Sequence, residues 1–272
     1  MPDLSRVTRA FGHLGRSKEV FRCAAGLREW PFAVTGYLGL SHPKLPATMH
    51  LRNGVVFEIE EFYDLETMWQ VWFRRVYPVL DSDRVIIDAG ANVGFFSAYA
   101  AAQNAQCRIW AIEPFASTFN RLVRTVEANG FSKRVSCHHM ALASTTASRR
   151  MTSGAAAPSQ LMSLLPLESA AADAASVHAV TLADFLDQNG IETVDLMKMD
   201  IEGSEFEVLL TSEIETLRRI RRVELEYHER PAPESKADIV RRFQEAGFLK
   251  TFDTAEDAVY GMARFERQPH AT

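Results

Sequence analysis

The chain has 272 residues, 47% of them hydrophobic and 24% charged, which is ordinary for a globular protein large enough to bury a full core. Its formal net charge of −5 argues against a general nucleic-acid binder, because neutralising phosphates requires a basic surface. Three cysteines without CxxC or metal-ligand spacing argue against a disulfide framework. No apolar run is long enough for a signal peptide or a membrane span, so we expect a cytoplasmic protein.

The first part of the chain predicts little regular structure before a hairpin. Glycines and prolines interrupt residues 1–45, so we expect only short helices or loose structure there. Between residues 49 and 59, Asn53-Gly54 separates two alternating runs. This pattern predicts a hairpin in which both turn residues have a positive φ.

A helix is expected after the hairpin. Asp64 has the chemistry of an N-cap, and the helix should end at about residue 76, because Pro78 cannot continue it. Four side chains of this segment could line a substrate pocket: Tyr63, Glu66, Trp69 and Trp72. Since Trp69 and Trp72 are three residues apart on one helix face, the alternative for them is a place in the core.

From residue 84 onwards, strands and helices alternate. Strands are predicted at 84–88, 107–112, 134–139, 194–199, 221–227, 248–252 and 259–265, and helices at 95–103, 116–129, 181–189, 203–211 and 235–246. Apolar strands that alternate with helices indicate an α/β fold, with a mainly parallel sheet covered on both faces. The last two strands are too close in sequence for a crossover helix, so they can pair only antiparallel.

This alternation breaks down between residues 143 and 180, where small residues, threonine and proline dominate. A long insertion in a compact domain is usually either a functional lid or a disordered segment. Both interpretations stay open, and the patch from Ser159 to Leu165 is the candidate lid.

Residues 85–96 form the most informative segment. A β-branched apolar run ends in Asp88, and Gly90 and Gly94 follow before a helical pattern begins. This order predicts a buried strand, a turn at which the backbone approaches a ligand, and a helix whose N-terminus faces that ligand.

The next strand adds a second cofactor signal, since it ends in Glu113-Pro114. A carboxylate there can accept two hydrogen bonds from a ribose diol, although Glu113 could instead cap the following helix. The turn before it lacks the G-x-G-x-x-G spacing of a dinucleotide site, because Ala91 and Asn92 occupy it. We therefore expect a cofactor without phosphates, an adenosine with an amino-acid tail. Asp88 could bind the ammonium of this tail, directly or through water, unless Asp88 merely pins the turn.

A second group of polar residues follows the strand at 194–199. Lys198 lies near the end of this buried strand, which is costly unless its ammonium is paired. Further polar side chains follow at the carboxyl ends of this strand and its expected neighbour: Asp200, Glu202, Glu226 and His228. Ligands of open α/β sheets collect at this edge.

Together these segments resemble the FkbM-type family of S-adenosylmethionine-dependent methyltransferases over about residues 48–265. The motifs that carry the resemblance are D-A-G-A-N-V-G-F at 88–95, E-P at 113–114, N-G at 129–130 and D-L-M-K-M-D-I-E-G-S-E at 195–205. The resemblance implies a Rossmann-like class I methyltransferase fold, a mainly parallel seven-stranded sheet with the last strand antiparallel and helices on both faces. We expect the methyltransferase domain over residues 81–268 and an N-terminal elaboration over residues 1–80 that could cap the substrate.

The resemblance also implies transfer of a methyl group from S-adenosyl-L-methionine to a hydroxyl of a sugar, polysaccharide or secondary metabolite. The expected cofactor-binding residues are Asp88, Gly90, Asn92, Gly94, Glu113, Pro114 and Asp200. The expected substrate residues are Glu202, Glu226, Trp69 and Tyr63. The expected partner is a small-molecule or glycan acceptor, with neither nucleic acid nor a membrane span, and the oligomeric state stays open.

Methyl transfer to oxygen mainly requires alignment of donor and acceptor, together with a base for the acceptor proton. We predict Asp200, Lys198 and His228 as the catalytic group, with His228 or Asp200 as the base and Lys198 holding Asp200 ionised or orienting the acceptor. One alternative is a structural ion-pair cluster. Another is a Mg²⁺ or Mn²⁺ site that also uses Glu202 and Glu226, but nothing in the spacing is diagnostic of a metal, so we predict no metal ligand.

Two other functions fit part of the pattern. A non-catalytic nucleoside-binding scaffold of a biosynthetic complex would keep the fold without its chemistry, and a degenerate turn or missing edge acids would favour it; neither is seen. An NAD-dependent dehydrogenase is disfavoured by the missing middle glycine of the turn.

Overall fold

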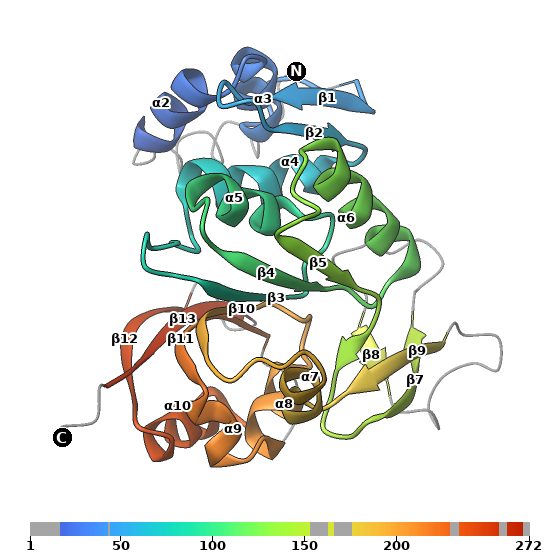
Figure 1. The fold of residues 1–272 in the computed structure, drawn as a ribbon. Coiled ribbons are helices and arrows are strands. Elements are labelled where there is room, and N and C mark those ends of the chain that lie inside the picture. Colours follow the sequence, from blue (N-terminus) through green and yellow to red (C-terminus); the bar gives the residue numbers. More distant parts are fainter. Residues whose placement is uncertain are drawn as a thin grey trace.

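A seven-stranded sheet runs through the centre of the molecule, in a computed structural model that describes residues 17–42, 44–152, 163–165, 176–228, 234–255 and 260–268 (Figure 1). In chain order its strands are β3 (Val85–Ala89), β4 (Arg108–Ile112), β5 (Val135–His138), β10 (Val194–Met199), β11 (Ile220–His228), β12 (Phe248–Ala255) and β13 (Tyr260–Arg267). Across the sheet they lie in the order β12-β13-β11-β10-β3-β4-β5. The pairs from β11 to β5 are parallel, whereas β13 is antiparallel to both β11 and β12. The predicted fold class and all the predicted strands are confirmed, with small differences at the strand ends.

Helices cover both faces of this sheet (Figure 1). One face carries α5 (Phe95–Gln103) and α6 (Ala116–Ala128), and the other carries α7 (Leu182–Gln188), α8 (Glu205–Thr211), α9 (Ile214–Arg218) and α10 (Lys236–Glu245). Ile86 packs in the core on the α5 side and Ile87 in the core on the α7 side, because successive strand residues point to opposite faces. Within the described part of the chain, no helix is both long and apolar enough to cross a bilayer.

The N-terminal elements lie on the α5 side of the sheet and form its outermost layer (Figure 1). They comprise α2 (Ser17–Gly26), α3 (Trp30–Tyr37) and a hairpin of β1 (Ala47–His50) and β2 (Val56–Ile59). The predicted hairpin is therefore confirmed, but its two-residue turn is wrong, since only Gly54 of the turn pair has a positive φ, at 96°. Leu51 leaves the strand pair to bridge Leu27 and its N–H donates to the carbonyl of Val55, which lengthens the loop.

The expected helix after the hairpin is present as α4 (Phe62–Met68), which continues into a π-helical turn, η2 (Trp69–Arg74). The prediction that Asp64 is the N-cap is wrong: Glu61 is the N-cap of α4, and Asp64 is the third residue of the helix. Asp64 Oδ2 reaches back to accept hydrogen bonds from the N–H groups of Glu60 and Glu61, at 2.7 and 2.9 Å. Asp64 is thus the N3 residue of a capping box, and its carboxylate accepts hydrogen bonds from backbone N–H groups at the start of the helix.

A second, four-stranded sheet occupies much of the region in which no strands were predicted. Its strands are β6 (Ala141–Leu142), β7 (Ala147–Thr152), β8 (Ser163–Leu165) and β9 (Ser176–Val180), in the order β6-β9-β7-β8. Small and polar residues such as those of β7 hide a strand from a hydrophobic pattern. Residues 153–162 and 166–175 lie outside the described residues, as does most of the patch from Ser159 that was the candidate lid.

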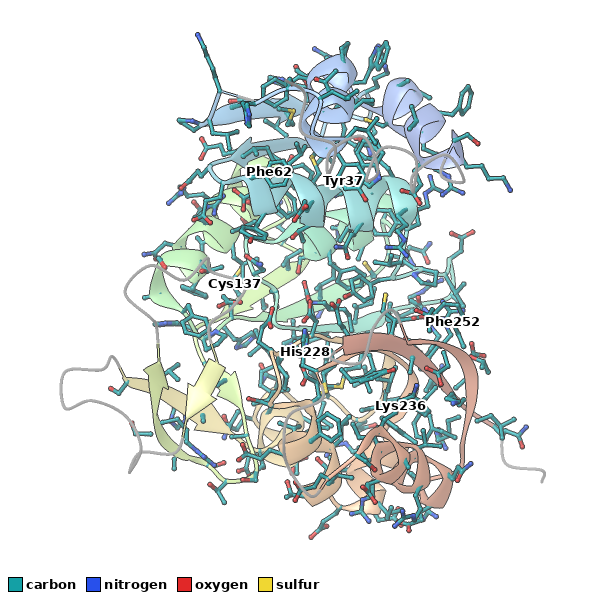
Figure 2. The ribbon with its side chains drawn as sticks, turned by 180° about the vertical axis from the view of Figure 1, so that it is seen from behind. Tyr37, Phe62, Cys137, His228, Lys236 and Phe252 are labelled. Atoms are coloured by element: carbon teal, nitrogen blue, oxygen red, sulfur yellow. The ribbon has the colours of Figure 1, made fainter. Side chains whose placement is uncertain are left out.

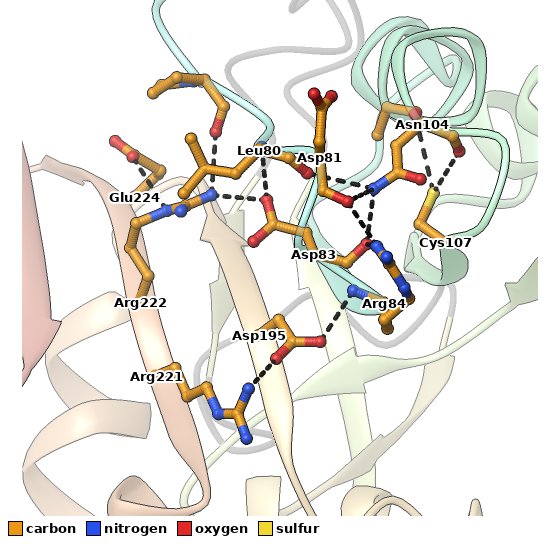
Figure 3. Close-up of polar contacts among 12 residues, drawn as sticks. Leu80, Asp81, Asp83, Arg84, Asn104, Cys107, Asp195, Arg221, Arg222 and Glu224 are labelled. Carbon is orange, nitrogen blue, oxygen red and sulfur yellow. Dashed lines mark hydrogen bonds and ion pairs between the residues drawn. The ribbon is translucent and has the colours of Figure 1, made fainter. Parts of the chain in front are cut away.

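The segment between η2 and β3 is fastened to the amino end of the sheet (Figure 3). Arg222 Nη2 donates to Asp83 Oδ2 at 2.7 Å and to the carbonyl oxygen of Pro78 at 3.1 Å. Asn104 Nδ2 donates to the carbonyl of Asp83 at 2.7 Å. These buried contacts fix the chain that leads from the N-terminal layer into the sheet.

Candidate functional site

A pocket lies at the carboxyl ends of β3, β4, β10 and β11 and is open to solvent; its empty space, counted together with the solvent at its mouth, is about 1100 Å³. The turn after β3 contributes Gly90, Ala91 and Asn92 to its wall. The ends of the neighbouring strands contribute Glu113, Pro114, Lys198, Asp200, Glu202 and Glu226. Eight of the predicted site residues therefore meet in one pocket: Gly90, Asn92, Glu113, Pro114, Lys198, Asp200, Glu202 and Glu226.

The two glycines of the turn have different roles. Gly90 has a φ of 74°, and a Cβ there would lie 1.7 Å from the carbonyl oxygen of Asp200. Gly94 is the N-cap of α5, with a φ of 92°, and a Cβ there would lie 2.9 Å from Leu122 on α6. Gly94 is not part of the pocket wall, and its close approach to α6 accounts for a glycine here, while its predicted place beside a ligand stays a prediction.

Asn92 and Glu113 form one side of the pocket. Asn92 has a left-handed φ of 50°, and its N–H donates to Glu113 Oε2 at 2.9 Å, while the N–H of Phe115 donates to Oε1 at 3.0 Å. Burial raises the pKa of Glu113 to about 7, although these backbone donors oppose the shift. The buried Oδ1 of Asn92 has no hydrogen-bond partner among the described residues. An acceptor without a donor in a pocket wall is suited to a ligand.

Asp88 lies beneath the pocket rather than on its wall. Its carboxylate is fully buried, accepts a hydrogen bond from Ser97 Oγ at 2.7 Å and pairs with Lys198 Nζ at 3.3 Å. Lys198 Nζ also donates to the carbonyl oxygen of Gly90 at 2.5 Å. The alternative, that Asp88 pins the turn, fits these contacts, and binding of a ligand ammonium by Asp88, directly or through water, stays a prediction. Burial lowers the pKa of Lys198, but the carboxylates of Asp88 and Asp200 outweigh it and raise that pKa.

The other side of the pocket is acidic. Tyr77 donates a hydrogen bond to Glu226 Oε2 at 2.7 Å, and Asp200 Oδ2 lies 3.8 Å from Lys198 Nζ. Burial, reinforced by Asp200, raises the pKa of Glu202 to about 8 and that of Glu226 to about 7. These groups therefore exchange protons near neutral pH.

His228 lies near the middle of the molecule, at the end of β11 (Figure 2). Its Nδ1 is 3.4 Å from Glu205 Oε1 and its Nε2 is 3.6 Å from Glu202 Oε2, and it is not part of the pocket wall. Burial lowers the pKa of His228, but the hydrogen bond that the imidazole donates to Glu205, together with nearby carboxylates, outweighs it and raises that pKa to about 9. A protonated imidazole cannot accept a proton, so the prediction of His228 as the base is not supported.

The metal alternative has a geometric counterpart among the described residues. Ligand atoms of Asp200, Glu226 and His228 all lie within 4.8 Å of one another. Oxygen ligands with one imidazole suit Mg²⁺ or Mn²⁺. However, both ring nitrogens of His228 already face carboxylates, which favours an imidazolium over a metal ligand.

The segment formed by α4, η2 and the residues after them contributes side chains to the pocket that were not predicted from the sequence. Trp69 is buried in the core, where it stacks on Tyr37 with ring centroids 4.2 Å apart and donates to Glu19 at 2.8 Å. Neither Trp69 nor Tyr63 is part of the pocket wall. Trp69 has the place in the core that was its alternative, and contact of Tyr63 with the substrate stays a prediction. The wall instead contains Thr67, Gln70, Val71 and Tyr77 from this side, with Phe95 and Phe96 from α5.

Comparison with known proteins identifies the family. Residues 88–250 match the model of the methyltransferase FkbM domain, a span that contains Gly90, Glu113, Asp200 and Glu226. The chain belongs to the FkbM methyltransferase family. The resemblance predicted from the sequence motifs is thereby confirmed.

Two named methyltransferases are among the relatives of this FkbM methyltransferase. Methyltransferase sdnD of Sordaria araneosa is 28% identical over 205 residues, which are 65% of the chain and 78% of that protein. Methyltransferase 1 of Beauveria bassiana is 29% identical over 159 residues, which are 52% of the chain and 64% of that protein, less than two thirds of its length.

The FkbM methyltransferase is also similar to solved structures. The structure of methyltransferase FkbM from Methylobacillus flagellatus KT aligns with a TM-score of 0.46 and 16% identity, over 94% of the chain and 60% of that chain. The TrmK protein of M. capricolum, in complex with S-adenosyl-homocysteine, aligns with a TM-score of 0.45 and 11% identity, over 72% of the chain and 67% of that chain.

Proposed function

We propose that the protein is an S-adenosylmethionine-dependent O-methyltransferase that acts on a hydroxyl of a sugar, polysaccharide or secondary metabolite. Family membership supports methyl transfer as the reaction class. The observation that carries the proposal is a single pocket in which Gly90, Asn92 and Glu113 lie on one side and the acids of β10 and β11 on the other.

The first side of the pocket has groups that fit the cofactor. Glu113 would hold the ribose diol, because each carboxylate oxygen accepts one backbone N–H and retains a lone pair for a ligand hydroxyl. Asn92 Oδ1 would accept a hydrogen bond from a polar group of the cofactor. Ile112, Phe115 and Leu142 add apolar surface to the wall, as a purine requires.

The remaining wall would hold the acceptor. Thr67, Gln70 and Tyr77 supply polar groups from the N-terminal side, and Phe95 and Phe96 supply apolar surface. Residues 1–80 would then act as a substrate cap on the methyltransferase domain of residues 81–268, since part of the acceptor wall belongs to them. Such a mixed wall suits a hydroxylated molecule with an apolar skeleton better than a phosphorylated one.

The chemistry demands positioning more than charge stabilisation. When bound, S-adenosylmethionine supplies a methyl group on a positively charged sulfur, and that charge disappears as the methyl moves. The protein residues must therefore hold the acceptor oxygen in line with the methyl carbon and exclude water. Asp200, on the acidic side of the pocket, would position the cofactor tail or the acceptor.

Calorimetry with S-adenosylhomocysteine tests the cofactor. We expect the intact protein to bind it, and Glu113→Ala and Glu113→Gln to weaken binding by about ten-fold to a hundred-fold, because hydrogen bonds to a charged group are lost. Glu127→Ala, an exposed acid on α6, is the matched control and should bind normally. No binding by the intact protein, unchanged binding by both Glu113 variants, or tighter binding of NADH would refute the proposal.

A further inference from the structure

Tyr77 and Glu226 join two distant parts of the chain inside the pocket. The Tyr77 hydroxyl donates to Glu226 Oε2 at 2.7 Å, and both side chains belong to the pocket wall. Tyr77 is only 4% exposed, and its ring packs edge-on against Phe96, with centroids 5.6 Å apart. Burial and nearby carboxylates raise the pKa of Tyr77 well above its ordinary value, so the hydroxyl stays protonated and remains a donor.

The backbone that carries Tyr77 is also fixed. The next residue, Pro78, accepts a hydrogen bond from Arg222 Nη2 at 3.1 Å, and Arg222 is held by Asp83 at 2.7 Å (Figure 3). Arg222 and Glu226 are on the same strand, β11. The donor and the acceptor of the hydrogen bond are therefore both anchored to β11, which fixes the direction of the Glu226 carboxylate.

Other candidate bases are less well placed. Lys198 is occupied by Asp88 and the carbonyl of Gly90, and an ammonium has no lone pair. No hydrogen bond orients the Asp200 side chain within the described residues, where its recorded polar contact is Lys198 at 3.8 Å. Glu226 differs because one oxygen is held by Tyr77 while Oε1 has no partner in the described chain.

We propose that Glu226 is the base that receives the acceptor proton and that Tyr77 is its positioning residue. This inference rests on the proposed function. In the reaction, a lone pair of the acceptor oxygen forms the new O–CH₃ bond while the S–CH₃ bond breaks and its electron pair returns to sulfur. The acceptor O–H bond breaks, and its proton passes to Glu226 Oε1. The products are the methyl ether, the neutral thioether and a protonated carboxyl that returns its proton to water.

The electrostatics of the pocket agree with this role. Burial and Asp200 raise the pKa of Glu226 to about 7, whereas the Tyr77 hydrogen bond lowers it. The charged and titratable groups that act on Glu226 are Asp200, Glu202, His228, Lys198 and Tyr77. A base that titrates near neutral pH combines a large ionised fraction with a useful proton affinity.

The first experiment needs no acceptor. The carboxyl ¹³C signal of Glu226, assigned by its loss in Glu226→Gln, is titrated in the S-adenosylhomocysteine complex. We expect titration near pH 7 in the wild type, a shift to higher pH in Tyr77→Phe, and no shift in Tyr99→Phe. Tyr99 is the matched control, a buried tyrosine that packs on Trp72 outside this pocket. Titration at the ordinary value of a glutamate, or no effect of Tyr77→Phe, would overturn the proposal.

The second experiment follows S-adenosylhomocysteine release with methyl glucoside as the hydroxyl probe. Glu226→Gln should lower kcat by about 10² to 10⁴-fold and remove the acid limb of the pH profile, while cofactor affinity stays unchanged. Tyr77→Phe should move that limb to higher pH. The control is Glu224→Gln, a buried acid of the same strand that is held by Arg264 at 2.6 Å and lies outside the pocket.

Three outcomes separate the explanations. Full turnover in Glu226→Gln would overturn the role of this carboxylate. Activity that is lost in EDTA and restored by Mn²⁺ would make Glu226 a cation ligand instead, with Asp200 and His228 as its partners. Failure of the wild type to bind S-adenosylhomocysteine would refute the proposed function itself. Normal binding, combined with full turnover in Glu226→Gln or with activity restored by Mn²⁺, would refute only the role of Glu226 as the base.

Discussion

The Lys198 ammonium donates to the carbonyl oxygen of Gly90 at 2.5 Å, across the boundary between β10 and the turn after β3. The same ammonium pairs with the fully buried Asp88 at 3.3 Å. A lysine in a family motif next to a pocket is easily interpreted as catalytic. Its contacts here are structural: they hold the turn after β3 in the shape on which cofactor binding would depend.

Replacing Lys198 should therefore destabilise the fold. Lys198→Met leaves the Asp88 carboxylate buried without its counter-charge, and we expect a loss of about 3 kcal/mol or more in the free energy of unfolding. Urea denaturation measures this loss, and adding Asp88→Asn should recover part of it. The control is Lys250→Met, which breaks a more exposed pair with Asp253 and should cost less than about 1 kcal/mol. Equal effects of the two lysine substitutions would contradict this account.

The close approach at Gly90 predicts a second contrast. Gly90→Ala places a methyl group 1.7 Å from the carbonyl oxygen of Asp200, so the turn and β10 must separate. We expect little folded protein, or a folded variant that no longer binds S-adenosylhomocysteine. Gly130→Ala has a similar φ of 68° but no atom within 4 Å, so it should cost only about 1 kcal/mol from backbone strain. Thermal unfolding of both variants, with calorimetry, would expose any failure of this contrast.

The sequence predicts the parts of the site that are determined by local pattern and sheet topology. Gly90, Glu113 and Asp200 each follow a recognisable strand and Glu226 lies near the end of another, and the carboxyl ends of parallel strands meet at one edge. The order of the strands in the sheet is therefore enough to predict that these residues meet in one pocket. The fold was predictable for the same reason, since its strands carry continuous apolar runs.

The residues that long-range packing decides were not predictable. Tyr77 is 149 positions from Glu226, and no spacing in the sequence connects them. Trp69 was predicted as a substrate residue with the core as its alternative, and its contacts with Glu19 on α2 and Tyr37 on α3 place it in the core. The signal that could have identified Tyr77 is its place between the N-terminal helix and Pro78, where a fixed turn presents a side chain.

Trp69 and Gln70 are neighbours on η2, but one is buried in the core and the other is part of the pocket wall, so we predict different effects of replacing them. Trp69→Ala removes a stacked, buried indole and should lower the free energy of unfolding by about 3–5 kcal/mol. Gln70→Ala should leave stability within about 0.5 kcal/mol but change the KM for the acceptor, because Gln70 is part of the pocket wall. Unfolding curves and initial rates with methyl glucoside measure both quantities. If Gln70→Ala altered stability but not KM, the wall would be wrongly assigned.

The environment of His228 predicts how stability depends on pH. Its pKa is raised to about 9 from an ordinary 6.5, so its stabilising contribution is complete below pH 6.5 and is lost as the pH rises through 9. Over that range the native state binds more protons than the unfolded state, and the free energy of unfolding must fall as the pH increases.

Other groups add to this dependence on pH. Glu202 and Glu226 act in the same direction as His228, but only up to about pH 8 for Glu202 and pH 7 for Glu226. The buried thiols of Cys137 and Cys23 also contribute from about pH 8 upwards, because they ionise near 9.0 when unfolded and burial raises their pKa to about 11 and 12. The contribution of His228 is therefore isolated by comparing variants rather than by the choice of pH interval. In urea titrations from pH 7 to 9, the free energy of unfolding should fall less steeply with pH in His228→Gln than in the wild type, whereas His178→Gln, an exposed histidine of β9, should match the wild type. An unchanged slope in His228→Gln would mean that the imidazole is neutral in the folded protein and remains available as a base or a ligand.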